Sequence, residues 1–126
     1  MAAELNHTIV WCRDKVQSST FLANILGRPP PTPFFHFMVV ELDNNVSLDF
    51  MEKEGDIALQ HYAFLIGESD FDAVFARIRA EGLTYWADPG RSRPNEINCN
   101  DGGRGFYFAD PNGHQLEVIT RRYGGG

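Results

Sequence analysis

The chain has 126 residues, a formal net charge of −6 and 43% hydrophobic residues. This length and composition predict one folded domain over residues 1–126 and argue against a disordered chain. The acidic balance argues against a nucleic-acid-binding protein, because phosphate contacts need clustered Lys and Arg.

The N-terminus and the cysteines indicate the compartment. The first residues contain neither a basic region nor a long apolar run, so no signal peptide is expected. No apolar stretch approaches the ~20 residues of a membrane span. The two cysteines, Cys12 and Cys99, are too few for a disulfide framework. We therefore expect a cytoplasmic protein with reduced thiols and no membrane partner.

The first half of the chain predicts strands around one helix. Apolar and β-compatible residues predict a strand over residues 5–12. Apolar side chains at helical spacing predict a helix over residues 16–26, with Gly27 as its stop signal. The four prolines of residues 29–33 predict a stiff, extended connection. A hairpin is expected next, with its strands over residues 34–42 and 46–51.

The second half repeats this order. A strand is expected over residues 58–66, followed by a helix in which Ser69 is the N-cap and Asp72 completes a capping box. His114, which follows the turn over residues 110–113, is expected to be exposed. The remaining predicted strands cover residues 83–86, 97–100, 105–109 and 116–120.

A histidine and an acid recur at matching places in the two halves. His7 and His61 lie on the first strand of each half, and Asp49 and Glu117 lie on the last. The repeat predicts an α+β fold of two βαβββ units, with curved, mostly antiparallel sheets and helices outside. The first repeat is expected over about residues 4–54 and the second over about residues 57–122.

Glu117 needs a partner, because it interrupts an apolar strand and an unpaired buried carboxylate is costly. If the two repeats pack about a twofold axis, His7 and His61 converge on Glu117. Two imidazoles and one carboxylate suit an open site for Fe(II), Mn(II) or Ni(II). Asp49 is then a fourth ligand, an acceptor for a ligand histidine, or a general base. Tyr107 is either a core residue or a phenol donor to a bound oxyanion.

Three segments, LNHTIV, QHYAFLI and GFYFADPNGHQLEVI, resemble the vicinal oxygen chelate superfamily. That superfamily includes glyoxalase I, fosfomycin-resistance proteins, bleomycin-binding proteins and type I extradiol dioxygenases. The resemblance covers essentially the whole chain and matches His7, His61 and Glu117 to metal-binding positions. It also implies that a homodimer completes the fold, with active sites at or near the interface.

Individual positions favour different members of the superfamily. Asp49 matches the position where glyoxalase-I-like proteins have a glutamate ligand. Tyr107 matches the catalytic tyrosine of extradiol dioxygenases, whereas Asn100 replaces their acid/base histidine. The lysine-bearing loop of fosfomycin-resistance proteins is missing, because residues 86–103 contain no lysine.

The resemblance therefore implies a small oxygenase in which Asp49, Tyr107 and Asn100 act beside the metal. The expected metal is Fe(II), with Mn(II), Ni(II) and Zn(II) as alternatives. The expected partners are dioxygen and an aromatic or polycyclic substrate that chelates the metal through vicinal oxygens. Two other functions stay open: a glyoxalase-like isomerase or lyase with Asp49 as a ligand, and a metal-free drug-binding protein of the bleomycin-resistance type.

Overall fold

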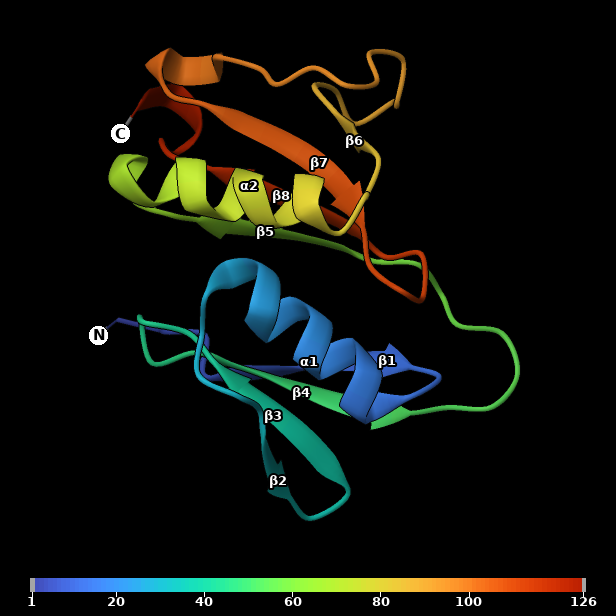
Figure 1. Ribbon diagram of the computed structural model, residues 1–126. Helices are drawn as coiled ribbons and strands as arrows, with labels where there is room; N and C mark the ends of the chain where they lie inside the picture. Colours follow the sequence, from blue (N-terminus) through green and yellow to red (C-terminus); the bar gives the residue numbers. More distant parts are fainter. Residues whose placement is uncertain (1, 126) are drawn as a thin grey trace. The chain divides into compact units, whose positions relative to one another are not determined.

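A computed structural model describes residues 2–125 as two compact units, with the boundary between Ala58 and Leu59 (Figure 1). Each unit contains one four-stranded sheet and one α-helix, in the same order along the chain. This confirms the predicted α+β class and the two βαβββ repeats. Within the described residues, no helix has the length and apolar character needed to cross a membrane.

In the first unit, the sheet has the strand order β1-β4-β3-β2. Strand β1 runs parallel to β4, and the other neighbours are antiparallel. The helix begins after Asp14, whose carboxylate accepts a hydrogen bond from the Gln17 backbone at 3.0 Å, and it ends at Gly27 with a φ of 69°. The elements are β1 (His7–Cys12), α1 (Lys15–Leu26), β2 (Thr32–Phe34), β3 (Phe37–Glu41) and β4 (Ser47–Glu52).

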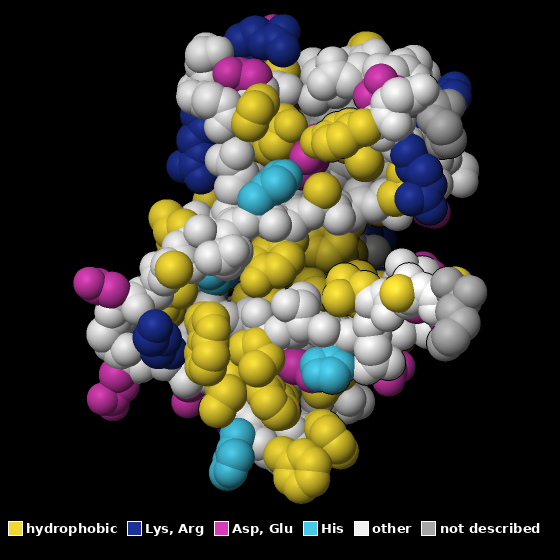
Figure 2. Space-filling view, turned by 180° about the vertical axis from the view of Figure 1, so that it is seen from behind, with side chains coloured by type: hydrophobic (Ala, Val, Ile, Leu, Met, Phe, Trp, Pro, Cys, Tyr) yellow, Lys and Arg dark blue, Asp and Glu magenta, His cyan; other side chains and the backbone are white. Residues whose placement is uncertain are grey.

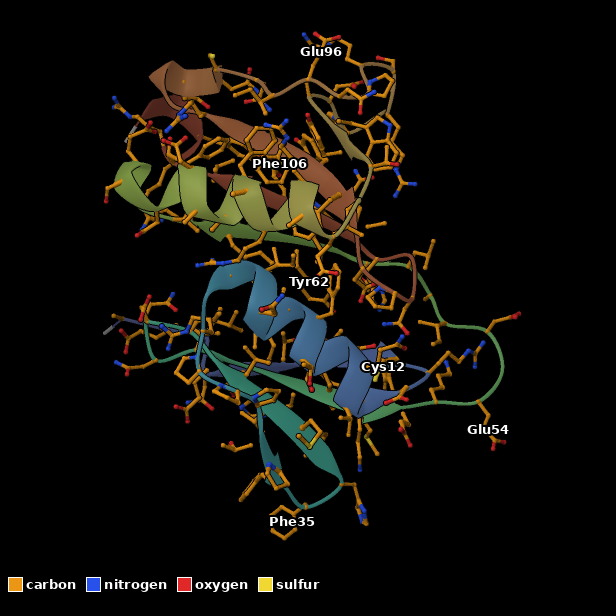
Figure 3. All side chains as sticks on the ribbon, in the orientation of Figure 1. Cys12, Phe35, Glu54, Tyr62, Glu96 and Phe106 are labelled. Atoms are coloured by element: carbon orange, nitrogen blue, oxygen red, sulfur yellow. The ribbon has the colours of Figure 1, made fainter. Side chains whose placement is uncertain are left out.

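The proline-rich connection ends in a short strand, β2, where only an extended connection was expected. Pro33 lies in β2 at the edge of the sheet, where proline is tolerated because one side of the strand needs no ladder hydrogen bonds. The long strand expected over residues 34–42 is broken at Phe35, whose φ is +51°. Phe35 therefore lies in the turn between β2 and β3, is 84% exposed and points away from the sheet (Figure 3).

In the second unit, the sheet has the strand order β5-β8-β7-β6. Strand β5 runs parallel to β8, and the other neighbours are again antiparallel, as in the first unit. The segment over residues 97–100 forms only a single bridge, between Asn98 and Gly105. The elements are β5 (His61–Leu65), α2 (Phe71–Ala80), β6 (Tyr85–Trp86), β7 (Gly105–Ala109) and β8 (Gln115–Ile119).

The capping box predicted for the second helix is wrong. Ser69 lies inside a 3₁₀ turn over Glu68–Asp70, and α2 begins only at Phe71, without a side-chain cap. Arg104 holds this helix start instead, because its guanidinium donates to both Glu68 and Asp72. The acid assigned to the box is therefore paired with a cation that lies 32 residues away in the sequence, directly before β7.

The predicted exposure of His114 is also wrong, because this residue is fully buried. Its Nδ1 accepts a hydrogen bond from the Gln60 backbone at 3.0 Å, and its ring lies edge-on to Tyr62. Asp110 accepts a hydrogen bond from the His114 backbone at 2.9 Å. His114 thus joins the turn before β8 to the start of β5, a role set by residues far away in the sequence.

An aromatic cluster fills one face of the second sheet. Phe106 and Phe108 of β7 are fully buried, and Phe106 contacts Phe71 and Phe75 of α2 with ring centroids 5.6 and 5.5 Å apart (Figure 3). Tyr85 of β6 adds a ring at 6.0 Å from Phe106. Because neighbouring strand residues point to opposite faces, Tyr107 must lie on the other side of the sheet.

Phe106→Ala should lower the free energy of unfolding by about 3–5 kcal/mol, because it leaves a cavity within this cluster. Phe35→Ala is the matched control; it should change stability by less than about 0.5 kcal/mol, because the ring is exposed. Urea denaturation measures both. Equal losses in the two variants would contradict the assignment of the core.

Candidate metal centre

Strand register gathers the candidate residues of the second unit on one face. Glu117 lies opposite Tyr107 on β7 and opposite Ala63 on β5, and His61 lies opposite Gln115. Gln115 and Glu117 are two positions apart and therefore share a face. This is the face turned away from α2, because Tyr107 alternates with the two phenylalanines that pack towards the helix.

His61 and Glu117 form the centre of this face. The Nε2 atom of His61 is 3.2 Å from Oε1 of Glu117, and its Nδ1 is 2.9 Å from the backbone oxygen of Gln115. The Glu117 side chain is 1% exposed, whereas that of His61 is 47% exposed, and Figure 2 shows histidine side chains at the surface. A buried carboxylate is thus in contact with an imidazole that solvent can reach.

The hydrogen bond at Nδ1 of His61 indicates what the His61–Glu117 pair can bind. A carbonyl oxygen only accepts, so Nδ1 of His61 carries a proton, and in the neutral ring Nε2 is an acceptor. Two acceptors then face each other at 3.2 Å, an arrangement that needs a cation: a proton on Nε2 or a metal ion bound to both. An imidazole oriented by a backbone carbonyl beside a carboxylate is the usual donor set of a metal site, so these residues fit a divalent metal.

Tyr123 completes the surroundings of Glu117, a contact that the sequence did not predict. Its hydroxyl lies 2.9 Å from Oε1 and 3.2 Å from Oε2 of Glu117. The segment that carries Tyr123 is held by a hydrogen bond from the Gly124 backbone to Asp101 at 3.1 Å. The only available signal was a tyrosine six positions after a strand acid, and nothing in that spacing predicts a contact.

The two tyrosines beside Glu117 keep their protons. Burial, the hydrogen bond to Tyr123 and the charge of Glu117 raise the pKa of Tyr107 well above its ordinary value. Burial and the hydrogen bond to Glu117 also raise the pKa of Tyr123. Both phenols are therefore neutral donors near pH 7, as expected for a residue that donates to an oxyanion.

The first unit repeats the arrangement in the same register. His7 lies opposite Ser47 and two positions before the partner of Asp49, as His61 lies opposite Gln115 and two positions before the partner of Glu117. Nδ1 of exposed His7 is 2.6 Å from the side-chain oxygen of Asn6. Asp49 is 8% exposed and accepts a hydrogen bond from the Ser47 hydroxyl at 2.9 Å.

The structure brings together part of the predicted site within each unit. Over residues 2–125 it contains no group of three or more His, Cys, Asp or Glu side chains arranged to hold a metal ion. It joins His61 to Glu117 and places His7 beside the strand of Asp49. Asn100 is exposed in a short turn, and its hydrogen bonds there are made by its backbone, to Asn98 and Gly103.

The chain as a whole corresponds to a known superfamily. The chain matches the Glyoxalase/Bleomycin resistance protein/Dioxygenase superfamily over residues 4–118, and it belongs to that superfamily. This confirms the predicted resemblance.

The similar proteins include transferases of known sequence and oxidases of known structure. Glutathione transferase FosA of Serratia marcescens is 38% identical over 94% of this chain and 81% of that protein. Metallothiol transferase FosB of Shouchella clausii is 30% identical over 95% of this chain and 82% of that protein. The solved structure of oxidase ChaP-H1 is 61% identical, with a TM-score of 0.96 over 98% of this chain and all of that one. Oxidase ChaP-H2 is 58% identical, with a TM-score of 0.97 over the whole of both chains.

Glu117 and Tyr123 should be energetically coupled. A double-mutant cycle of Glu117→Gln and Tyr123→Phe should give a coupling free energy of about 1 kcal/mol or more, because a charged acceptor loses its donor. Urea denaturation measures each corner of the cycle. Glu81→Gln, an exposed acid at the end of α2, serves as the control partner for Tyr123→Phe and should be additive with it. Additivity in both cycles would show that the hydroxyl does not bind Glu117.

Proposed function

We propose that the protein is an Fe(II)-dependent oxygenase of the vicinal oxygen chelate superfamily, with His7, His61 and Glu117 as the metal ligands. Its substrate is an aromatic or polycyclic compound that chelates the metal through two neighbouring oxygens. The observation that carries the proposal is the facing pair of acceptors, Nε2 of His61 and Oε1 of Glu117. The matching register of His7 in the first unit supports the third ligand.

The relatives favour oxidation as the reaction. The structures of 61% and 58% identity are called oxidases, whereas the relatives called thiol or glutathione transferases are 30% and 38% identical. The name of one relative, metallothiol transferase FosB, also supports a divalent metal as the cofactor. Bound Fe(II) would supply a Lewis acid with open positions for the substrate and dioxygen.

The remaining residues handle the substrate and its proton. Asp49 is the proposed general base: Oδ1 has the Ser47 hydroxyl as its donor, and among residues 2–125 Oδ2 has no hydrogen-bond donor. That oxygen is available to take the proton of a substrate hydroxyl. Tyr107 stays protonated and donates to a substrate oxyanion. Asn100 is the proposed polar contact to a substrate or oxygen atom.

The proposed ligand set draws on both units of the chain. We therefore propose that the two units form one domain of 126 residues. Membership of the superfamily supports the further proposal that the protein works as a homodimer. The main rival is a glyoxalase-like isomerase or lyase, in which Asp49 joins the ligands and the metal is Ni(II) or Zn(II). The equivalent register of Asp49 and Glu117 favours this rival over a metal-free binding protein.

Metal content tests the ligand set. Each single alanine variant of a proposed ligand should weaken Fe(II) or Mn(II) binding by at least about 10–100-fold, because that loss is already typical when a residue that hydrogen-bonds to a ligand is removed. The variants are His7→Ala, His61→Ala and Glu117→Ala. His36→Ala is the control, because His36 lies in the exposed β2–β3 turn. Mass spectrometry of dialysed protein gives the metal per chain. Unchanged metal content in all three ligand variants would exclude the site.

Oxygen consumption tests the reaction. After anaerobic reconstitution with Fe(II), the protein should take up dioxygen with a catechol or polycyclic quinol in an oxygen-electrode screen. Asp49→Asn should lower kcat by about 10²–10⁴-fold while metal content is unchanged, since it removes only the base. Loss of metal in this variant, without oxygen uptake by the wild type, would instead support the glyoxalase-like rival.

A further inference from the structure

An ordered loop between β6 and β7 carries a cation beside the candidate site. Asp88 holds the loop: its carboxylate accepts from the backbone of Ser92, the Ser92 hydroxyl at 2.6 Å and the backbone of Arg93. The Ser92 hydroxyl lowers the pKa of Asp88, so these bonds are present at neutral pH. Arg91, at the tip, has a φ of +59°, a conformation that costs free energy in a non-glycine residue.

The Arg91 side chain is fixed at two points. Its guanidinium carbon is 4.5 Å from the centre of the Trp86 ring, a cation–π distance. Its Nε donates to the side-chain oxygen of Gln115 at 3.1 Å. The amide nitrogen of Gln115 in turn donates to the Pro89 backbone at 3.1 Å, which ties the strand back to the loop.

Contacts through Gln115 join Arg91 to the candidate metal ligand His61 within one unit. Gln115 contacts Arg91 through its side chain and His61 through its backbone oxygen. Trp86 lies opposite Tyr107 in the sheet, and the Tyr107 ring is stacked with His61 at 6.0 Å and 28°. Arg91 therefore lies on the same face of the sheet as His61, separated from it by flat aromatic and amide groups.

The guanidinium of Arg91 has no carboxylate partner among the described residues. Arg104 and Arg28 bind carboxylates, whereas Arg91 has no acidic partner in the described part of the chain. Within that part it donates a hydrogen bond through Nε alone, so its two Nη nitrogens keep their N–H donors open. Among the described residues, the guanidinium of Arg91 is thus held beside the Trp86 ring without a carboxylate to neutralise it.

We propose that Arg91 is a specificity-determining residue that binds an anionic oxygen group, such as a carboxylate or ionised phenol, on a flat aromatic substrate. The ring system lies along Trp86 and Tyr107, and the anion meets the open Nη donors in a charge-assisted pair. The aromatic class of the substrate rests on the proposed function. The anionic group is new and follows from the unpaired guanidinium.

A pair of probes that differ only in one anion tests the proposal. Isothermal titration calorimetry compares naphthalene-2,3-diol with 6,7-dihydroxynaphthalene-2-sulfonate on the wild type, Arg91→Met, Arg91→Lys and Arg93→Met. The wild type should bind the sulfonate about tenfold more tightly, as a charge-assisted hydrogen bond predicts. Arg91→Met should lose this preference and keep its affinity for the neutral diol within about twofold.

The control variants separate charge, geometry and loop structure. Arg91→Lys keeps the charge without the planar fork and should retain part of the preference. Arg93→Met alters the same loop and should bind both probes as the wild type does. A wild type that binds the two probes equally, or binds neither, overturns the proposal. An Arg91→Met variant that weakens both probes alike also overturns it, since Arg91 would then only support the loop.

The readout is independent of the proposed reaction. The shared diol contributes equally to both probes, so their affinity ratio isolates the anion whether or not a metal is bound. A preference for the sulfonate without any oxygen uptake would keep Arg91 as an anion-binding residue and refute the oxygenase. Oxygen uptake with equal affinities would keep the oxygenase and refute the role of Arg91.

Discussion

The contact between His61 and Glu117 constrains the groups around it on this face of the second sheet. A carboxylate with 1% of its side chain exposed must have donors or a cation, and the Gln115 carbonyl fixes the imidazole so that Nε2 faces it. The hydroxyl of Tyr123 then supplies a neutral donor to this carboxylate. This face of the second sheet therefore favours a positive charge between Nε2 of His61 and Oε1 of Glu117.

The two faces of the second sheet have different roles: one carries the hydrophobic core and the other the candidate site. One buries Phe106 against α2 with Phe108 beside it, which stabilises the unit and fixes the strand register. Because strand residues alternate, that register also sets Tyr107 beside Glu117 on the other face. The packing of the core therefore positions the candidate site residues. A slip of the strand register by one residue would move the core residues to the site face and the site residues to the core face. The first unit obeys the same rule, with Asp49 where the second has Glu117.

The fold was predictable where a pattern is local. Apolar spacing and Gly27 located α1, and the recurring histidine and acid revealed the repeat. The errors lie where a distant partner decides. His114 is buried because it accepts a hydrogen bond from Gln60, 54 positions away, and the Ser69 cap failed because Arg104 holds the helix start. Tyr123 reaches Glu117 through a segment without sequence pattern, so that part of the site required the structure.

The central claim is that Nε2 of His61 and Glu117 bind a metal together with His7. Long-range ¹H–¹⁵N spectra of the histidine rings, recorded while Zn(II) replaces Fe(II) as a diamagnetic ion, test it most directly. The account predicts that Nε2 of His61 and of His7 shift on metal binding while Nδ1 of His61 stays protonated. Zn(II) binding that leaves both rings unchanged, or shifts only His36 and His114, would contradict it.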